Sequence, residues 1–271
     1  MRPFLDDLSA VELRVLARIR LAVTARLAAA AAAHDPGLAE HGSRPFRLAL
    51  RVPGLPRAFV AKTEGPVTAW AGGETPVQRL PPDLTLFFPS SRDCARVLDG
   101  SAGRVFPIPG GWGAARALRY FRAAAASAPR MLRSPDTPAV LRAALLLEAA
   151  MSALVETANA DPAMAPRLAH APDGLVVVDA GGGVRRALRK EGGRLRSVRV
   201  PEDGQDAVLA FRDPESAVAV LAGKKSAVTA LGACEASIRG LVPLVQGLFA
   251  VLDRASRYLA VKAEKEAGHG R

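Results

Sequence analysis

An internal repeat constrains this chain of 271 residues more than any other feature. Five short patterns occur twice, in the same order and at a nearly constant separation, so the chain is predicted to be a tandem duplication of a unit of about 125 residues. The separation falls by about four residues late in the unit, which predicts a shorter connection between strands in the second copy. In chain order the matched pairs are Asp35-Pro36 and Asp161-Pro162, 46–50 and 175–178, 62–65 and 189–192, 84–88 and 207–211, and 95–100 and 218–223.

Each copy is predicted to be α+β, beginning with a long helix. Apolar side chains recur at helical spacing over 10–33 and 138–158. The Asp-Pro pairs end these helices, because a residue before proline is disfavoured in the helical region. Short strands follow in both copies, and we expect hairpin turns at Gly181-Gly182-Gly183 and Gly192-Gly193.

The end of each copy is predicted to be mainly helical. Short helices are expected after Ser90 and after Asp213, where Asp213 is the N-cap and Pro214 takes the first helical position. A closing helix over 241–260 carries a wide apolar stripe, which must be covered by a sheet, a partner or a ligand. The expected domains are 1–134 and 135–261, followed by a disordered charged tail over 262–271.

The second copy resembles the sterol carrier protein type-2 family over about residues 137–260. The resemblance rests on the order and spacing of the segments 207–215, 219–225 and 233–240, which precede the apolar closing helix. The first copy resembles the family more faintly. There, Pro107 and Pro109 interrupt the strand before the closing helix, which suits an edge strand at best. We interpret it as a degenerate sterol-carrier-like unit.

The resemblance implies a small, largely antiparallel or mixed sheet covered by helices, enclosing an apolar tunnel. A fatty acid, a sterol-like molecule, an acyl group or an isoprenoid quinone would be the ligand. An ordinary packed core is the alternative interpretation of the same apolar side chains. The candidate lipid-binding residues are Phe211, Val220, Leu221, Leu231, Ile238, Leu244, Leu248, Phe249 and Leu252.

The chain is strongly basic, with 37 Lys and Arg against 26 Asp and Glu. Two arginine clusters stand out, and each has three interpretations: a solvated face, a docking face for anionic membrane, or a nucleic-acid site. Nucleic acid is disfavoured because no aromatic side chain interleaves the arginines to stack on bases. The candidate membrane- or anion-docking residues are Arg116, Arg119, Arg122, Arg185, Arg186, Arg189 and Arg196.

The sequence contains no recognisable catalytic or metal-binding motif. The four histidines lack metal-ligand spacing, and Cys94 and Cys234, both expected to be buried, cannot form a disulfide framework. The glycines at 181–183 lack the dinucleotide-binding spacing, and no serine has nucleophile-elbow spacing. Together with the function that the family resemblance implies, this leads us to expect a non-catalytic lipid-binding or lipid-transfer protein that needs no metal or cofactor.

Two other functions and the cellular location remain as expectations. The first alternative is an accessory or scaffold protein for isoprenoid-quinone biosynthesis, a role that members of the resembling family play. The second is a nucleic-acid-binding protein that uses the arginine-rich hairpin. The N-terminal sequence lacks the pattern of a signal peptide, so we expect a cytoplasmic protein, with peripheral membrane association as an option. The oligomeric state is left open.

Overall fold

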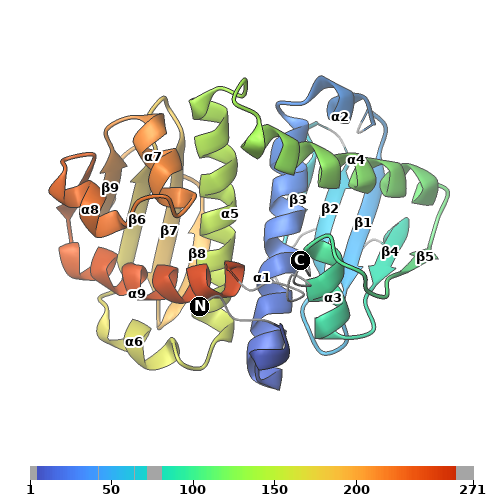
Figure 1. Cartoon of the computed structure of the whole chain (residues 1–271), viewed down its shortest axis with the longest axis horizontal. Coiled ribbons are helices and arrows are strands. Elements are labelled where there is room, and N and C mark those ends of the chain that lie inside the picture. The colour runs from blue at the N-terminus through green and yellow to red at the C-terminus, as the bar shows by residue number, and fades with distance from the viewer. Residues whose placement is uncertain (1–4, 42, 64, 72–80, 261–271) are drawn as a thin grey trace, which may run out of the picture. The chain divides into compact units, whose positions relative to one another are not determined.

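The computed structural model describes residues 5–41, 43–63, 65–71 and 81–260. The chain forms two compact units: unit 1 comprises Met1–Ser127 with Arg254–Arg271, and unit 2 comprises Ala128–Asp253. Each unit is a five-stranded sheet with helices (Figure 1), so the predicted α+β class with two tandem sheet-and-helix units is confirmed. The predicted charged tail over 262–271 lies outside the described residues.

Unit 1 builds a mixed sheet in the order β3-β2-β1-β4-β5. The central strand β1 pairs parallel with β4, while the other pairings are antiparallel. The elements in chain order are η1 (Leu5–Asp7), α1 (Ala10–Ala32), α2 (Pro36–His41), β1 (Phe46–Arg51), β2 (Ala58–Lys62), β3 (Thr68–Trp70), β4 (Leu84–Phe87), α3 (Ser91–Leu98), β5 (Phe106–Pro109) and α4 (Ala114–Arg133).

Unit 2 repeats this topology, with a sheet in the order β10-β9-β6-β7-β8. Again the first strand of the unit, β6, is central and pairs parallel with the fourth, β9. The connection into the fourth strand is shorter than in unit 1, as the sequence predicts. The elements are α5 (Ala139–Ala160), α6 (Ala165–His170), β6 (Gly174–Asp179), β7 (Arg185–Glu191), β8 (Arg194–Val198), β9 (Ala207–Phe211), α7 (Pro214–Leu221), α8 (Ala227–Gly232), β10 (Ala236–Gly240) and α9 (Val242–Leu259).

Local sequence signals set several element boundaries. Gly181-Gly182-Gly183 turns the chain between β6 and β7, and Gly192-Gly193 does so between β7 and β8, as predicted. Gly192 and Gly193 both have positive φ, at 56° and 74°, which a tight two-residue hairpin requires. Two predicted helix starts are also confirmed: Ser90 accepts from the N–H of Asp93 at 3.0 Å, and Asp213 accepts from that of Ser216 at 2.7 Å.

One aspartate in each unit ties the fourth strand to the first. Oδ2 of Asp83 accepts from the backbone N–H of Arg47 at 2.8 Å, and Oδ2 of Asp206 accepts from that of Leu175 at 2.7 Å. The N–H groups of the same aspartates donate to the carbonyl oxygens of Arg47 and Leu175, both at 2.9 Å. Each aspartate thus fixes the register where the parallel pairing begins.

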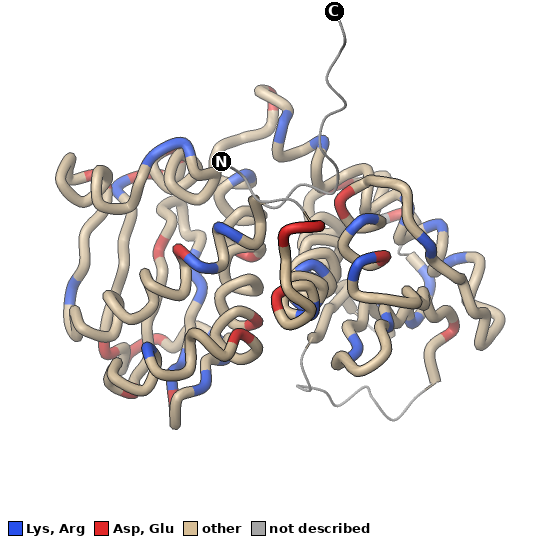
Figure 2. The backbone as a smooth tube through the Cα atoms, turned by 60° about the horizontal axis from the view of Figure 1, so that its bottom comes forward, with Lys and Arg blue, Asp and Glu red and all other residues tan. Residues whose placement is uncertain are grey.

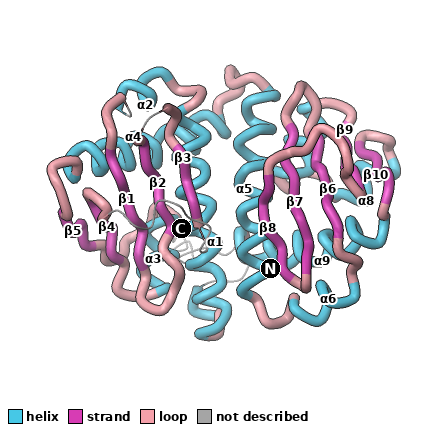
Figure 3. The backbone as a smooth tube through the Cα atoms, turned by 180° about the vertical axis from the view of Figure 1, so that it is seen from behind, coloured by secondary structure: helices cyan, strands magenta, loops and turns pink. Residues whose placement is uncertain are grey.

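The helices lie on one face of each sheet, and the strands are seen in front of them from behind (Figures 1 and 3). In unit 1 the fully buried Tyr120 of α4 packs against Phe46 of β1, with ring centroids 4.6 Å apart. Its hydroxyl donates to the carbonyl oxygen of Ala28 at 2.5 Å. Because side chains alternate along a strand, Leu48 and Leu50 share the face of Phe46 and point toward the helices.

The opposite side of each sheet is called the helix-free face here. In unit 2 it carries a small buried cluster of Leu175, Val177 and Ala187, against which Val200 packs. In unit 1 the edge strand β5 contains Pro107 and Pro109, and the edge position of this strand agrees with the prediction. None of the helices in the described part of the chain combines the length and the apolar character that a bilayer crossing requires.

Candidate functional site: an apolar cavity in unit 2

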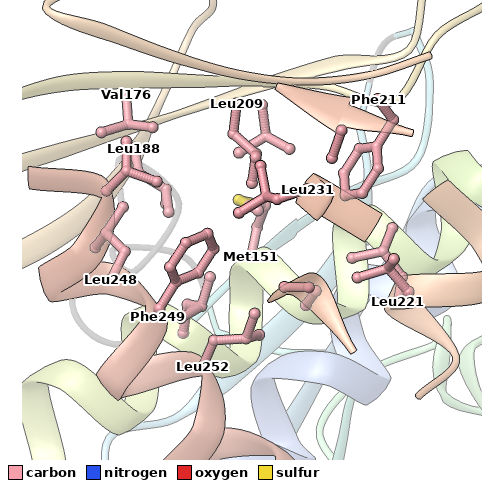
Figure 4. A pocket seen from close by; sticks show the side chains of 17 residues that line it. Met151, Val176, Leu188, Leu209, Phe211, Leu221, Leu231, Leu248, Phe249 and Leu252 are labelled. Carbon is pink, nitrogen blue, oxygen red and sulfur yellow. The ribbon is translucent and has the colours of Figure 1, made fainter. Parts of the chain in front are cut away.

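Unit 2 contains a cavity of about 50 Å³ between its sheet and its helices (Figure 4). All of its lining residues are apolar, and the only heteroatom among their side chains is the sulfur of Met151. An apolar cavity of this kind stays dry, because water inside it finds no hydrogen-bond partners. At about 24 cal/mol per Å³, leaving it empty costs about 1 kcal/mol of stability.

The sheet provides one wall of the cavity. Val176 and Val178 of β6 lie two positions apart, as do Leu209 and Phe211 of β9, so each pair points to the same side of the sheet. Leu188 of β7 pairs directly with Val176 and completes this wall. The alternation of apolar side chains along three neighbouring strands therefore produces a continuous hydrocarbon surface.

The helices provide the opposite wall. Met151 comes from α5, Leu231 from α8, and Leu248, Phe249 and Leu252 from α9. The three α9 residues have the spacing i, i+1 and i+4, so they occupy one side of the helix. Leu231, Phe249 and Leu252 are only half-buried, so this wall reaches the molecular surface.

Most of the predicted lipid-binding residues lie around this cavity. Ile238 and Leu244 are not among its lining residues. Ile238 pairs with Leu209 but lies on the edge strand β10, and it packs against the same core cluster. Leu244 is fully buried in that core, and its Cδ2 lies close to Gly174. The predicted residues that line the cavity are Phe211, Val220, Leu221, Leu231, Leu248, Phe249 and Leu252.

The sequence patterns do not indicate the contributions of α5 and of the central strands to the cavity. Met151 and Leu154 belong to a helix whose apolar periodicity was recognised, but the face turned to the cavity depends on tertiary packing. Val176 and Leu188 sit in segments recognised as strands. The strand alternation could have identified them once the pairing of β6 with β7 and β9 was known.

The predicted docking residues belong to two segments, α4 and the hairpin of β7 and β8. In unit 1, Arg119 and Arg122 are exposed on α4, and Nη1 of Arg116 donates to the carbonyl oxygen of Pro45 at 2.6 Å. Within each unit, the described Lys and Arg residues are interspersed with Asp and Glu along the backbone (Figure 2). Along the backbone of each unit, negative residues therefore interrupt the positive ones.

The arginine-rich hairpin of unit 2 is divided between two faces of the sheet. Arg185, Arg189 and Arg196 lie on the helix-free face, whereas Arg186 points to the helix side and its Nε lies 2.7 Å from Oε2 of Glu148. Arg185 pairs with Asp179 at 3.8 Å and Arg196 with Glu191 at 2.7 Å. These acidic partners offset much of the positive charge of the hairpin.

The two cysteines differ in environment. Cys94 is fully buried in α3, and burial raises the pKa of its thiol to about 12. Cys234 is exposed in the turn after α8, where its φ of 56° is left-handed, so the expectation that it is buried is wrong. The tight turn that ends α8 directs this side chain outward. The described residues contain no group of three or more His, Cys, Asp or Glu side chains placed to hold a metal ion.

The fold and the cavity together define a duplicated α+β protein with an apolar cavity in its second unit. No family model matches the chain, and no curated protein matches it. Among solved structures, one described as "UbiJ-SCP2 Ubiquinone synthesis protein" is similar at 17% sequence identity with a TM-score of 0.32. The match covers 39% of this chain and 90% of that chain. This similarity is weak, and the cavity carries the functional proposal that follows.

Proposed function

We propose that unit 2 binds an apolar lipid in its cavity without catalysing a reaction. The observation that carries the proposal is the wall itself, which offers hydrocarbon and one thioether but no hydrogen-bond donor. A fatty acid, a sterol-like molecule, an acyl group or an isoprenoid quinone fits this chemistry. The polar end of such a ligand must remain at the surface, because burying it without a partner costs several kcal/mol.

The cavity is narrow, so a ligand has to widen it. Each buried methylene contributes about 0.8 kcal/mol, so a chain of several methylenes offsets the cost of moving the lining side chains. Leu231, Phe249 and Leu252 of α8 and α9 are half-buried, so moving them outward disrupts less packing than moving the fully buried lining residues. The ligand-free protein is then a closed form that opens along this wall.

A titration of the full chain with a fluorescent fatty acid tests the proposal. We expect saturable binding, and Leu231→Trp should weaken it at least about tenfold because the indole occupies the cavity. Val228→Trp is the matched control, since Val228 is on the same helix but 77% exposed. Circular dichroism would establish that both variants fold. Non-saturable binding, or equal affinities for the two variants, would contradict the proposal.

Lipid binding in the cavity is common to two functions: lipid transfer by a free carrier, and an accessory role in isoprenoid-quinone biosynthesis. Ligand exchange between the purified protein and lipid vesicles supports a carrier. Recovery of biosynthetic enzymes with the tagged chain, dependent on the same cavity residue Leu231, supports an accessory role.

A further inference from the structure

A glycine-rich loop in unit 1 holds a tryptophan fully in solvent. The side chain of Trp112, between β5 and α4, is 103% exposed. Its neighbours Gly110, Gly111 and Gly113 pack so closely on the chain around Asp83 that none of them has room for a Cβ. The N–H of Gly110 also donates to the carbonyl oxygen of Asp83 at 2.8 Å. The backbone path is therefore fixed, and the indole is presented outward.

A basic depression of about 440 Å³ adjoins the indole. Trp112 lines it together with Arg47, Lys62 and Arg116. Nζ of Lys62 donates to the carbonyl oxygen of Gly65 at 2.7 Å, and Arg116 likewise bonds to a carbonyl oxygen. Among the described residues that line the depression, the one carboxylate is that of Asp83, which lies 3.7 Å from Nε of Arg47, so cations outnumber carboxylates in this described lining. Such a depression attracts anions.

Exposed apolar side chains lie on the strand that leads into this loop. Phe106 and Ile108 of β5 are 51% and 50% exposed. They pair with Phe87 and Thr85 of β4, which alternate with the helix-facing Leu84 and Leu86, so they lie on the helix-free face. Large exposed apolar side chains grouped with basic ones mark an interaction surface.

The edge strand itself argues against a protein strand as the partner. Pro107 and Pro109 provide no N–H to an incoming strand, so β5 cannot readily extend its sheet. Aromatic, aliphatic and basic side chains together match the interface of an anionic bilayer, where indoles lie at headgroup level and basic groups meet lipid phosphates.

We propose that unit 1 docks onto an anionic phospholipid bilayer through this surface. Trp112 enters the headgroup region, Phe106 and Ile108 add apolar contact, and Lys62 and Arg116 contact lipid phosphates. This docking concerns unit 1 alone, so it stands whether or not the cavity of unit 2 holds a lipid.

Cosedimentation of the full chain with phosphatidylcholine vesicles, with and without phosphatidylglycerol, tests the docking. We expect binding only with phosphatidylglycerol, weakening as salt is added. Trp112→Ser should reduce the partition coefficient about tenfold and Arg116→Gln about fivefold, which corresponds to ~1 kcal/mol for one basic group. Val228→Ser, which removes another exposed apolar side chain, should have no effect.

Tryptophan fluorescence provides a direct readout of insertion. The chain has two tryptophans, so Trp70→Phe leaves Trp112 as the only one. Its emission should shift to the blue on anionic vesicles and be quenched by brominated lipids. An unshifted emission, or unchanged vesicle binding by Trp112→Ser, would overturn the proposal. So would a Trp112-dependent self-association of the purified chain, because the surface would then be a contact between copies.

Discussion

The carboxylate of Asp206 accepts a hydrogen bond from the backbone N–H of Leu175 at 2.7 Å, joining the start of β9 to the start of β6. Asp83 makes the same bond to Arg47 in unit 1, at 2.8 Å. The carbonyl oxygens of both aspartates also accept from the segment that enters the closing helix. One residue thus connects three parts of each unit, and its recurrence supports the duplication at the level of individual hydrogen bonds.

Replacing Asp206 with alanine should destabilise the protein by about 1–2 kcal/mol, because the N–H of Leu175 loses a charged acceptor. Urea unfolding followed by circular dichroism measures the change. Asp206→Asn keeps an acceptor oxygen, so it should lose less stability than Asp206→Ala. Asp203→Ala removes a charge from the same connection and should be nearly neutral; equal losses for the alanine variants at 203 and 206 would refute the role of the hydrogen bond.

Gly240→Ala should lower the stability of the protein more than a glycine replacement elsewhere in unit 2. Gly240 has a φ of +84°, and a Cβ there would collide with the carbonyl oxygen of Asp206. We expect a loss of about 2 kcal/mol or more, combining backbone strain and steric overlap. Gly232→Ala is the control, since no atom lies within 4 Å of its Cβ position and its φ is ordinary. Thermal unfolding of both variants should separate them clearly, and similar melting temperatures would contradict this account.

The N-cap of α7 should make stability depend on acid pH. Hydrogen bonds from Ser216, with a smaller contribution from Arg212, lower the pKa of Asp213 from 3.8 to about 2. A carboxyl with a depressed folded-state pKa stabilises the fold above its unfolded pKa, and this contribution is lost as pH falls from about 4 to about 2. Asp213→Asn retains a cap oxygen that does not titrate. Between about pH 5 and about pH 2 its melting temperature should therefore fall less than that of the parent chain, whereas parallel pH curves would show that Asp213 is not responsible.

The two thiols should react at very different rates. Cys234 is exposed, whereas Cys94 is fully buried and burial raises its pKa to about 12. Since the thiolate is the reactive form, a disulfide reagent should label Cys234 in the native protein and reach Cys94 only on unfolding. Cys234→Ser should abolish the native reaction. Fast labelling of that variant under native conditions would show that α3 opens readily.

Much of the fold could be predicted because it is encoded locally. Helical periodicity predicted α1 and α5, the paired glycines predicted the hairpin around Gly192, and the caps Ser90 and Asp213 predicted two helix starts. These signals involve residues within a few positions of one another. The short helices α2, α6 and α8 were missed, because six-residue helices show too little periodicity to recognise.

The site was predicted only in part, because it depends on contacts between distant segments. The apolar stripe on α9 indicates that Leu248, Phe249 and Leu252 must pack against other apolar groups, and all three line the cavity. That those groups include Met151 and Leu188 depends on the packing of α5 and on the pairing of β6 with β7, which no local pattern specifies. The expectation that Cys234 is buried is wrong for a similar reason. Its apolar neighbours in the sequence do not indicate that its backbone takes a left-handed turn conformation.

The identity of what the purified protein carries tests the central claim most directly. Native mass spectrometry of the full chain, followed by organic extraction of the same sample, measures any bound ligand. We expect an added mass that is released into the organic phase as an apolar lipid, and that is absent from Leu231→Trp but retained by Val228→Trp. A protein that carries no lipid, and that takes up none when offered fatty acids, would contradict lipid binding in the cavity of unit 2.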